Sequence, residues 1–240
     1  AAGFRSNYLT MRLYTPSSWQ DVEPNAEITV TPYIDQYVRI KYGAYDVGVR
    51  AVHDVPVKIT PPDIQFNDTE TILYGADKIT SIGNLAPLYA GTIDVSKAVK
   101  LSELIIGAGG NYNNTNLKSL TLGNNVLLNK LDIRNCSALT GALDVSGCTN
   151  LRELYAEGTA LNSVKLADAG MITILRLPDT ITNLTLKNQN HITDFVCGQA
   201  MTTLVIENCN IDSLSLLRNT NPNKVRITGI DWTLEDFTLL

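Results

Sequence analysis

The chain has 240 residues, 44% of them hydrophobic, and a formal net charge of -5 in which acidic and basic residues are interspersed. This apolar fraction excludes a disordered chain, and no apolar run approaches the length of a transmembrane helix. Because there is no block of basic residues, we do not expect a nucleic-acid surface. The length allows a substantial core, in one elongated array or in an array with a small domain.

Residues 1–62 have the composition of a small antiparallel β unit. Four stretches rich in β-branched and aromatic residues are separated by Pro and Gly, and Pro61-Pro62 closes the last. These stretches are NYLTMRLYTP, AEITVTPY, YVRIKYGAY and VPVKITPP. Two interpretations are open. The unit is either a cap over the apolar end of a repeat array, which we favour, or a carbohydrate-binding unit with stacking tyrosines.

Residues 63–116 predict degenerate first repeats. The motifs ITSIGNL (79–85), TIDVS (92–96) and LSELIIG (101–107) share the apolar spacing of the later repeats, less regularly. A loop rich in Gly and Asn, GAGGNYNNTN (107–116), follows them. This loop lacks both GxGxxG and GKS/T, so we expect a surface loop and not a phosphate site.

Residues 117–230 predict a regular array. Each motif fits LxxLxL, or that template with one apolar residue missing, and the middle apolar residues recur about every ten positions. Alternate members are roughly 19 to 23 residues apart, which is within the range of leucine-rich repeats. About five residues separate successive motifs, too few for a helix. We therefore predict a mostly β leucine-rich-repeat solenoid with a period of about 21 residues and two short parallel strands per coil. The middle residues are Leu120, Leu131, Leu143, Leu154, Val164, Leu175, Leu184, Phe195, Leu204, Leu214 and Val225.

The residues between the apolar positions are predicted to point to solvent. They are Asp132, Asp144, Arg152, Lys165, Arg176, Thr185 and Arg226. From one face of the array we predict four ligand-binding residues, Arg134, Arg152, Tyr155 and Arg176. An aromatic ring beside stacked guanidinium groups suits recognition of a partner. The alternative is an ordinary solvated sheet face.

The four cysteines are predicted to be buried structural thiols. Cys136, Cys148 and Cys209 each follow a middle apolar residue by five positions, and Cys197 takes an inward apolar position. In leucine-rich repeats the former position points inward and bonds the turn backbone. Other residues suited to this role at equivalent positions are Asn125, Asn219, Thr159 and Thr180. Disulfides or a metal site are the alternative, but there is no CxxC pair and neither His53 nor His191 has ligand spacing to a cysteine.

A search for catalytic motifs finds none, and we predict a protein that is not an enzyme and has no cofactor and no metal. The carboxylate pairs Glu153/Glu157 and Glu235-Asp236 are interpreted as solvated surface charge. Residues 231–240 predict the start of a C-terminal segment. Because the chain begins AAGFRSNYL, without Met or a signal peptide, and ends on two leucines, we expect a segment of a longer polypeptide.

Several phrases carry a resemblance to known families. LDIRNC (131–136) and LDVSGC (143–148) resemble the short alternating leucine-rich repeats of bacterial surface proteins. Longer phrases resemble a segment of large structural proteins of phages and prophages of gut Firmicutes. These are FNDTETILYGADKITSIGNLAPLYAG (66–91), LTGALDVSGCTNL (139–151), LPDTITNLTLKNQ (177–189) and VRITGIDWTLED (225–236). The resemblance implies a virion or tail-associated location and a scaffolding or attachment role, and it supplies no catalytic residues.

Three functional hypotheses follow. The first is a virion structural protein that serves as a rigid scaffold or host-attachment decoration, with other virion proteins or a host cell-surface protein or glycan as partners. It predicts a homo-oligomer or a place in a repetitive assembly. The second is an extracellular adhesin or ligand-binding receptor module on a bacterial cell surface, which predicts a monomer. The third is an accessory domain of an enzyme. All three predict no nucleic-acid partner and no membrane insertion.

Overall fold

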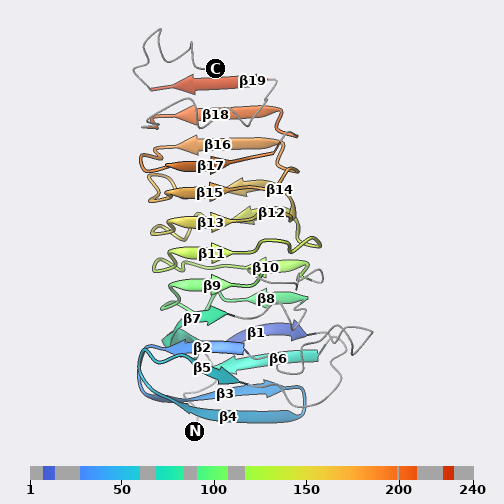
Figure 1. Ribbon diagram of the computed structural model, residues 1–240, viewed down its shortest axis with the longest axis vertical. Helices are drawn as coiled ribbons and strands as arrows, with labels where there is room; N and C mark the ends of the chain where they lie inside the picture. The colour runs from blue at the N-terminus through green and yellow to red at the C-terminus, as the bar shows by residue number, and fades with distance from the viewer. Residues whose placement is uncertain are drawn as a thin grey trace.

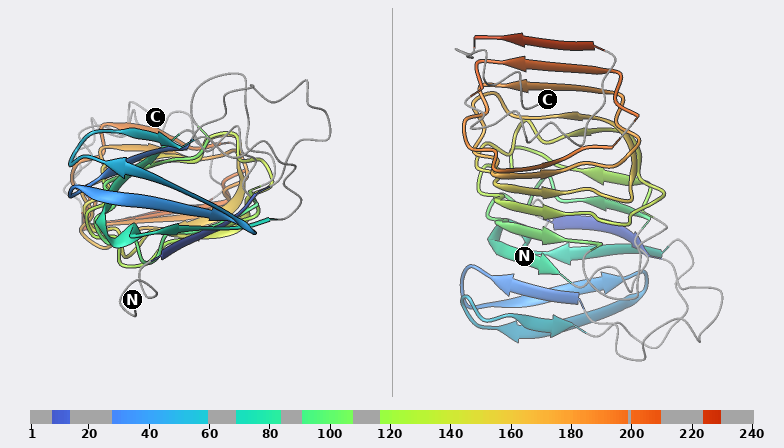
Figure 2. Two further views of the ribbon diagram at one scale, coloured as in Figure 1. Left: turned by 90° about the horizontal axis from the view of Figure 1, so that it is seen from below. Right: turned by 45° about the horizontal axis from the view of Figure 1, so that its top comes forward.

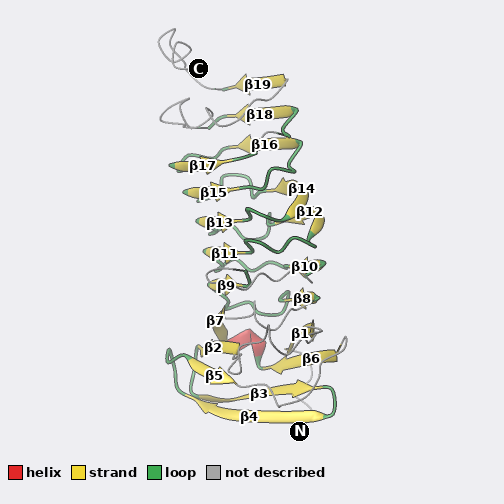
Figure 3. Cartoon of the chain, turned by 45° about the vertical axis from the view of Figure 1, so that its right-hand side comes forward, coloured by secondary structure: helices red, strands yellow, loops and turns green. Residues whose placement is uncertain are grey.

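The computed structural model describes residues 8–13, 28–59, 69–83, 91–107, 117–198, 200–209 and 224–229. These residues form a mostly β protein, and within them there is no α-helix, only the short 3₁₀ turn η2 (Ala76–Lys78) (Figure 3). No helix in this part of the chain is long and apolar enough to cross a membrane. The predicted C-terminal segment, 231–240, the loop at 108–116 and Pro61-Pro62 lie outside the described residues.

The strands stack into a solenoid with two broad faces (Figure 1). One face is a single eight-stranded sheet, here called the long sheet. In spatial order its strands are β17 (Asp194–Val196), β15 (Ile174–Arg176), β13 (Glu153–Tyr155), β11 (Lys130–Asp132), β9 (Glu103–Ile105), β7 (Ile79–Gly83), β2 (Ile28–Pro32) and β5 (Val57–Ile59).

The other face is divided into three sheets. The first, here called the cap sheet, has the order β10 (Ser119–Thr121), β8 (Thr92–Asp94), β1 (Tyr8–Leu13), β6 (Thr69–Tyr74), β3 (Gln36–Tyr42) and β4 (Tyr45–Ala51). The second pairs β12 (Thr140–Asp144) with β14 (Ala160–Lys165). The third joins β16 (Asn183–Lys187), β18 (Thr203–Glu207) and β19 (Lys224–Thr228).

The predicted repeat is confirmed by the strand register. In the long sheet the parallel ladders align the middle apolar residues of successive coils, which are Leu104, Leu131, Leu154, Leu175 and Phe195. On the other face Leu184 aligns with Leu204 and Val225. Aligned neighbours such as Leu154 and Leu175 are one repeat apart, in agreement with the ~21-residue period. Each coil therefore contributes one strand to each face, as expected; Leu214 lies outside the described residues.

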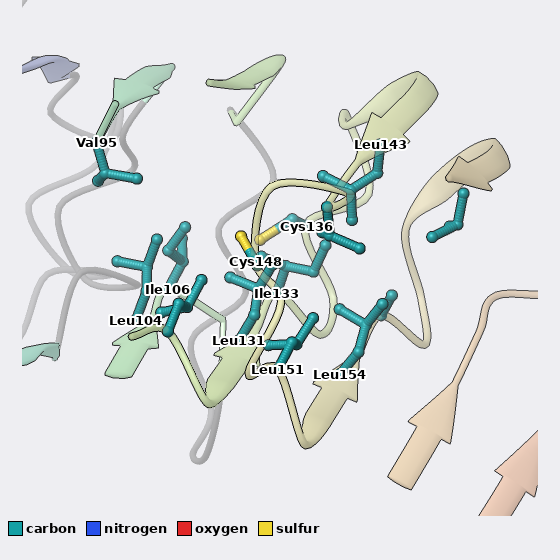
Figure 4. Packing of buried hydrophobic residues seen from close by; sticks show 14 of the residues in the cluster. Val95, Leu104, Ile106, Leu131, Ile133, Cys136, Leu143, Cys148, Leu151 and Leu154 are labelled. Carbon is teal, nitrogen blue, oxygen red and sulfur yellow. The ribbon is translucent and has the colours of Figure 1, made fainter. Parts of the chain in front are cut away.

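The core consists of the apolar side chains that point between the two faces (Figure 4). Leu131 and Leu154 on the long sheet and Cys136 in the turn are 0% exposed, and Leu143 on the opposite face is 3% exposed. Each fully buried leucine contributes roughly 1.5–3 kcal/mol relative to an exposed one. A single coil would leave both of its flat ends in water, so this burial exists only when coils stack.

The turns between strands are held by recurring polar contacts. Buried Asn125 accepts a hydrogen bond from Gly123 N at 2.8 Å and donates through Nδ2 to Val95 O and Ala98 O of the preceding coil. Buried Thr159 likewise donates its hydroxyl to a turn carbonyl, 2.8 Å away. The predicted inward polar position is confirmed at both residues. Several turns also contain one residue in the left-handed conformation, with φ between 49° and 74°, at Asn135, Gly158, Asn188, Asn208 and Gly229.

The N-terminal strands are antiparallel, as predicted, and they extend both faces of the solenoid (Figure 2). Strand β1 inserts between β8 and β6, and β2 pairs with β7. Val38, Ile40 and Tyr42 of β3 are 0% exposed and belong to the same core as the repeats. Both faces thus run across the predicted boundary at residue 62 without interruption of the core, and the boundary itself stays a prediction.

Replacement of Leu154 by Ala should lower the free energy of unfolding by about 2–5 kcal/mol, because the cavity would lie in the middle of the array. Urea unfolding followed by circular dichroism measures this change. Leu127→Ala is the matched control, since Leu127 is 43% exposed in a turn and its truncation should cost less than about 1 kcal/mol. Equal effects of the two substitutions would contradict the packing described here.

Candidate functional site

The predicted ligand-binding residues lie on the outer face of the long sheet. The ladders place Asp132, Tyr155 and Arg176 in one row across β11, β13 and β15. Adjacent strands are about 4.8 Å apart, so side chains of this row are neighbours. With the charged residues around them they form what we call the Tyr155 cluster, which comprises Lys130, Asp132, Arg134, Glu153, Tyr155, Glu157, Arg176 and Asp194.

Tyr155 is enclosed by side chains of its own chain. The guanidinium carbon of Arg134 lies 4.9 Å from the ring centroid and Lys130 Nζ lies 5.8 Å from it. The hydroxyl donates to Glu153 Oε2 at 3.1 Å. Burial, followed by this contact with Glu153, raises the pKa of Tyr155. The ring therefore already holds cations in the positions where a ligand would stack.

Asp132 corrects one of the predictions from the sequence. It was expected to point to solvent, but its side chain is 1% exposed. Arg134 covers it with a two-pronged contact, in which Nε lies 3.0 Å from Oδ1 and Nη2 lies 2.6 Å from Oδ2. The Arg134 backbone N–H also donates to Oδ1. Because Arg134 must lie flat to reach both Tyr155 and this carboxylate, it closes the space above Asp132.

Arg176 is also paired. Its Nε and Nη2 donate to Asp194 Oδ2 at 3.0 and 2.7 Å, and Nη1 lies 3.6 Å from Glu157 Oε1. Arg152 is exposed, and in the described part of the chain no ion pair or ring contact joins it to the cluster. The structure thus brings Arg134, Tyr155 and Arg176 together and leaves Arg152 apart.

From the sequence, Asp132, Glu153 and Glu157 were expected only to be surface charge and Asp194 was not named, so the pairing of the candidate residues with these four carboxylates was not predicted. The signal that could have found them is the repeat period, which places Lys130 and Glu153 at equivalent positions of successive coils. The three cations and four carboxylates nearly cancel one another. Chemically this surface is a rigid polar patch in which each cation already faces a carboxylate.

A second feature is a cleft on the opposite face, where that face is interrupted. Strands β14 and β16 do not share a ladder, and Ala169 between them takes the left-handed conformation with φ of 54°. The cleft has a volume of about 290 Å³, at the small end for ligand pockets. Its lining is Val164, Lys165, Leu166, Ala167, Asp168, Asn183, Thr185, Lys187 and Gln189. Gln189 is 1% exposed and its Nε2 donates to Ala167 O and Lys187 O, which ties the two edges together.

The four cysteines are free thiols and buried, as predicted. Burial raises the pKa of Cys136 to about 12 and those of Cys148 and Cys197 to about 11. Their thiolate forms are therefore rare near neutral pH. Within the described ranges, no group of three or more His, Cys, Asp and Glu side chains is arranged to hold a metal ion.

Comparison of the chain with known protein families, with curated proteins and with solved structures finds no match in any of the three. The molecule is a β-solenoid of about 5 turns with a ~21-residue period. Membership of the leucine-rich-repeat or phage families remains a hypothesis from the sequence.

The thiols should resist thiol–disulfide exchange in the folded protein. At pH 8 we expect a disulfide reagent such as DTNB to react with none of the four within minutes, and with all four in guanidinium chloride, because raised pKa values and burial both suppress attack. Absorbance at 412 nm counts the reacted thiols. Rapid native reaction of even one cysteine would contradict the burial described.

Asp132→Ala should lower the free energy of unfolding by about 1–3 kcal/mol, because Arg134 loses a shielded, two-pronged partner. Asp144→Ala is a matched control. Asp144 also follows a middle apolar leucine and also accepts the N–H two residues on, but its side chain is 58% exposed. We expect its loss to cost less than about 1 kcal/mol in the same urea titration. If Asp144→Ala lowered the free energy of unfolding more than Asp132→Ala does, the contact between Asp132 and Arg134 would not be present in solution.

Proposed function

We propose that this chain is a non-catalytic structural and binding module of a phage virion, which presents a rigid surface for host attachment or for scaffolding. The observation that carries the proposal is the unbroken parallel ladder from β7 to β17 over a core that is almost fully buried. In such a stack the outer residues of successive coils have fixed relative positions. Fixed positions reduce the ordering cost of binding an extended partner.

The dimensions suit a spacer or a contact surface. Stacked strands advance about 4.8 Å per coil, so about five coils extend the array by roughly 25 Å. Both broad faces are covered with polar and charged side chains at every coil. A partner that contacts several coils would meet polar and charged side chains at regular intervals along the array.

The chemistry of the described surface supports a role without catalysis. In the Tyr155 cluster, the arginines and the lysine each face a carboxylate at 2.6–3.7 Å, an arrangement typical of structural ion pairs. The lining of the cleft has a single carboxylate, Asp168, and no histidine or cysteine to form a nucleophile–base pair. The resemblance to phage structural proteins supports the virion as location. An exported bacterial adhesin is the alternative on the same fold.

The purified protein should form a defined multimer of three or more copies by light scattering, and it should sediment with intact cells of some gut Firmicutes in a saturable manner. Cells of an unrelated Gram-negative bacterium serve as the control. A monomer that binds these cells would favour the adhesin alternative. A monomer that sediments with none of them would contradict both attachment roles.

A further inference from the structure

Strands β3 and β4 of the cap sheet lie at the end of the solenoid opposite β19 (Figure 1). A row of side chains crosses the outer face of this sheet. The register aligns Tyr8 of β1 with Tyr74 of β6, Tyr74 with Arg39 of β3, and Arg39 with Gly48 of β4. Directly opposed residues share one face of a sheet. The alternate residues of β3, among them Val38 and Ile40, are buried, so this row faces outward.

On β4 the row is occupied by the ring of Tyr37, which lies over Gly48. A Cβ placed on Gly48 would lie 2.0 Å from Tyr37 Cε1 and 2.6 Å from its Cζ. The ring therefore lies across the glycine, in the space that any other side chain would fill. Glycine in a strand interior is unfavourable unless it makes room for another group, and here it makes room for the ring and hydroxyl of Tyr37. That ring is 66% exposed.

Arg39 contacts one of these tyrosines, Tyr74. Its guanidinium carbon lies 4.9 Å from the Tyr74 ring centroid, and its Nε donates to Asp46 Oδ1 at 2.7 Å. This contact fixes the guanidinium plane, and hydrogen bonding from Arg39 lowers the pKa of the Asp46 carboxyl. Both side chains remain partly exposed, at 48% and 41%. They thus keep donors and acceptors available beside the rings.

We call Tyr8, Tyr37, Arg39, Asp46 and Tyr74 the tyrosine strip. It spans four strands, or about 14 Å at 4.8 Å per strand. Arg39 covers the ring of Tyr74 much as Arg134 covers that of Tyr155, but Tyr37 and Tyr8 differ from both because they keep 66% and 41% of their surface in water. Large exposed aromatic side chains in a continuous row mark a contact surface.

We propose that the tyrosine strip binds an extended polysaccharide that carries carboxylate groups. This inference rests on the proposed attachment function and names the surface that would make the contact. The apolar C–H faces of sugar rings pack on exposed aromatic rings, and planar Arg and Asp side chains bond pairs of hydroxyls.

The charge of this surface selects an acidic chain. On the outward side of β3, β4 and β6, three cations face two carboxylates, which gives a local excess of one positive charge on a chain of net charge -5. These residues are Arg39, Lys41, Arg50, Asp46 and Glu70.

Affinity electrophoresis tests the proposal in native gels that contain alginate, polygalacturonate or hyaluronate, with neutral β-glucan and single-stranded poly(dT) as comparisons. We expect retardation in at least one acidic polysaccharide gel, and weaker or no retardation in the others. No retardation in any of the three acidic gels, or stronger retardation by poly(dT), would overturn it.

Two substitutions that act on the same ring in different ways localise the contact. Tyr37→Ala removes the ring, whereas Gly48→Ala keeps the ring and displaces it from the sheet. Each should weaken binding at least about tenfold, the loss expected for one stacking contact. The matched controls are Tyr33→Ala, whose ring is 46% exposed but lies before β3, and Gly83→Ala, where a Cβ meets no atom within 4 Å. Circular dichroism confirms folding. Tyr8→Ala, at the far end of the strip, replaces either variant that fails to fold.

The same variants separate this inference from the function on which it rests. If Tyr37→Ala and Gly48→Ala bind polysaccharide and cells as well as the controls do, attachment stands and the tyrosine strip is refuted. If the intact protein binds an acidic polysaccharide through the strip but sediments with no cells, the strip stands and the attachment role is refuted.

Discussion

The fold depends on one constraint, the burial of apolar side chains between two faces that no single coil can close. Leu131 and Leu154 become inaccessible to water only because neighbouring coils lie above and below them. The same requirement explains the N-terminal strands, whose Val38, Ile40 and Tyr42 extend the core and cover its first coils. Polar turn residues such as Asn125 then satisfy the backbone groups that stacking would otherwise leave buried without partners.

This constraint also decides what the surface can do. Because the core fixes every strand, outward side chains meet their counterparts one coil away in a constant geometry. On the long sheet this produces the Tyr155 cluster, in which the charges neutralise one another and the ring is covered. On the cap sheet Tyr37 and Tyr8 stay open to water, in a row that also contains the fixed guanidinium group of Arg39. The two surfaces contain similar residues, but tyrosine rings are exposed to a ligand only on the cap sheet.

In the regular array the sequence was sufficient to predict the strands, their spacing and most of their inward residues, because periodicity within the chain reports burial directly. It predicted that Arg134, Tyr155 and Arg176 share a face for the same reason. It did not predict β6 or most of β4. It could not predict the burial of Asp132, which depends on how Arg134 turns toward the tyrosine of the next coil. Nor could it predict that β1 inserts between β8 and β6, since that pairing joins segments that are far apart in the sequence.

The interruption between β14 and β16 has a similar origin. The repeat motifs on either side are regular, and the segment between them contains Ala169, whose left-handed backbone has no sequence marker of the kind that glycine provides. Gly158, by contrast, marks its turn, because a Cβ there would lie 2.5 Å from Asn135 Oδ1 in the preceding coil. A glycine in the sequence thus marks the turn at Gly158, whereas no residue type marks the left-handed position at Ala169.

Residue-resolved amide hydrogen exchange of the native protein tests the central claim, that stability comes from stacking both faces of neighbouring coils. The account predicts that the slowest amides lie in the central coils, and that strands of the two faces of one coil, such as β13 and β14, exchange with similar free energies of opening. Strong protection of the long sheet together with rapid exchange in β12 and β14 would contradict it.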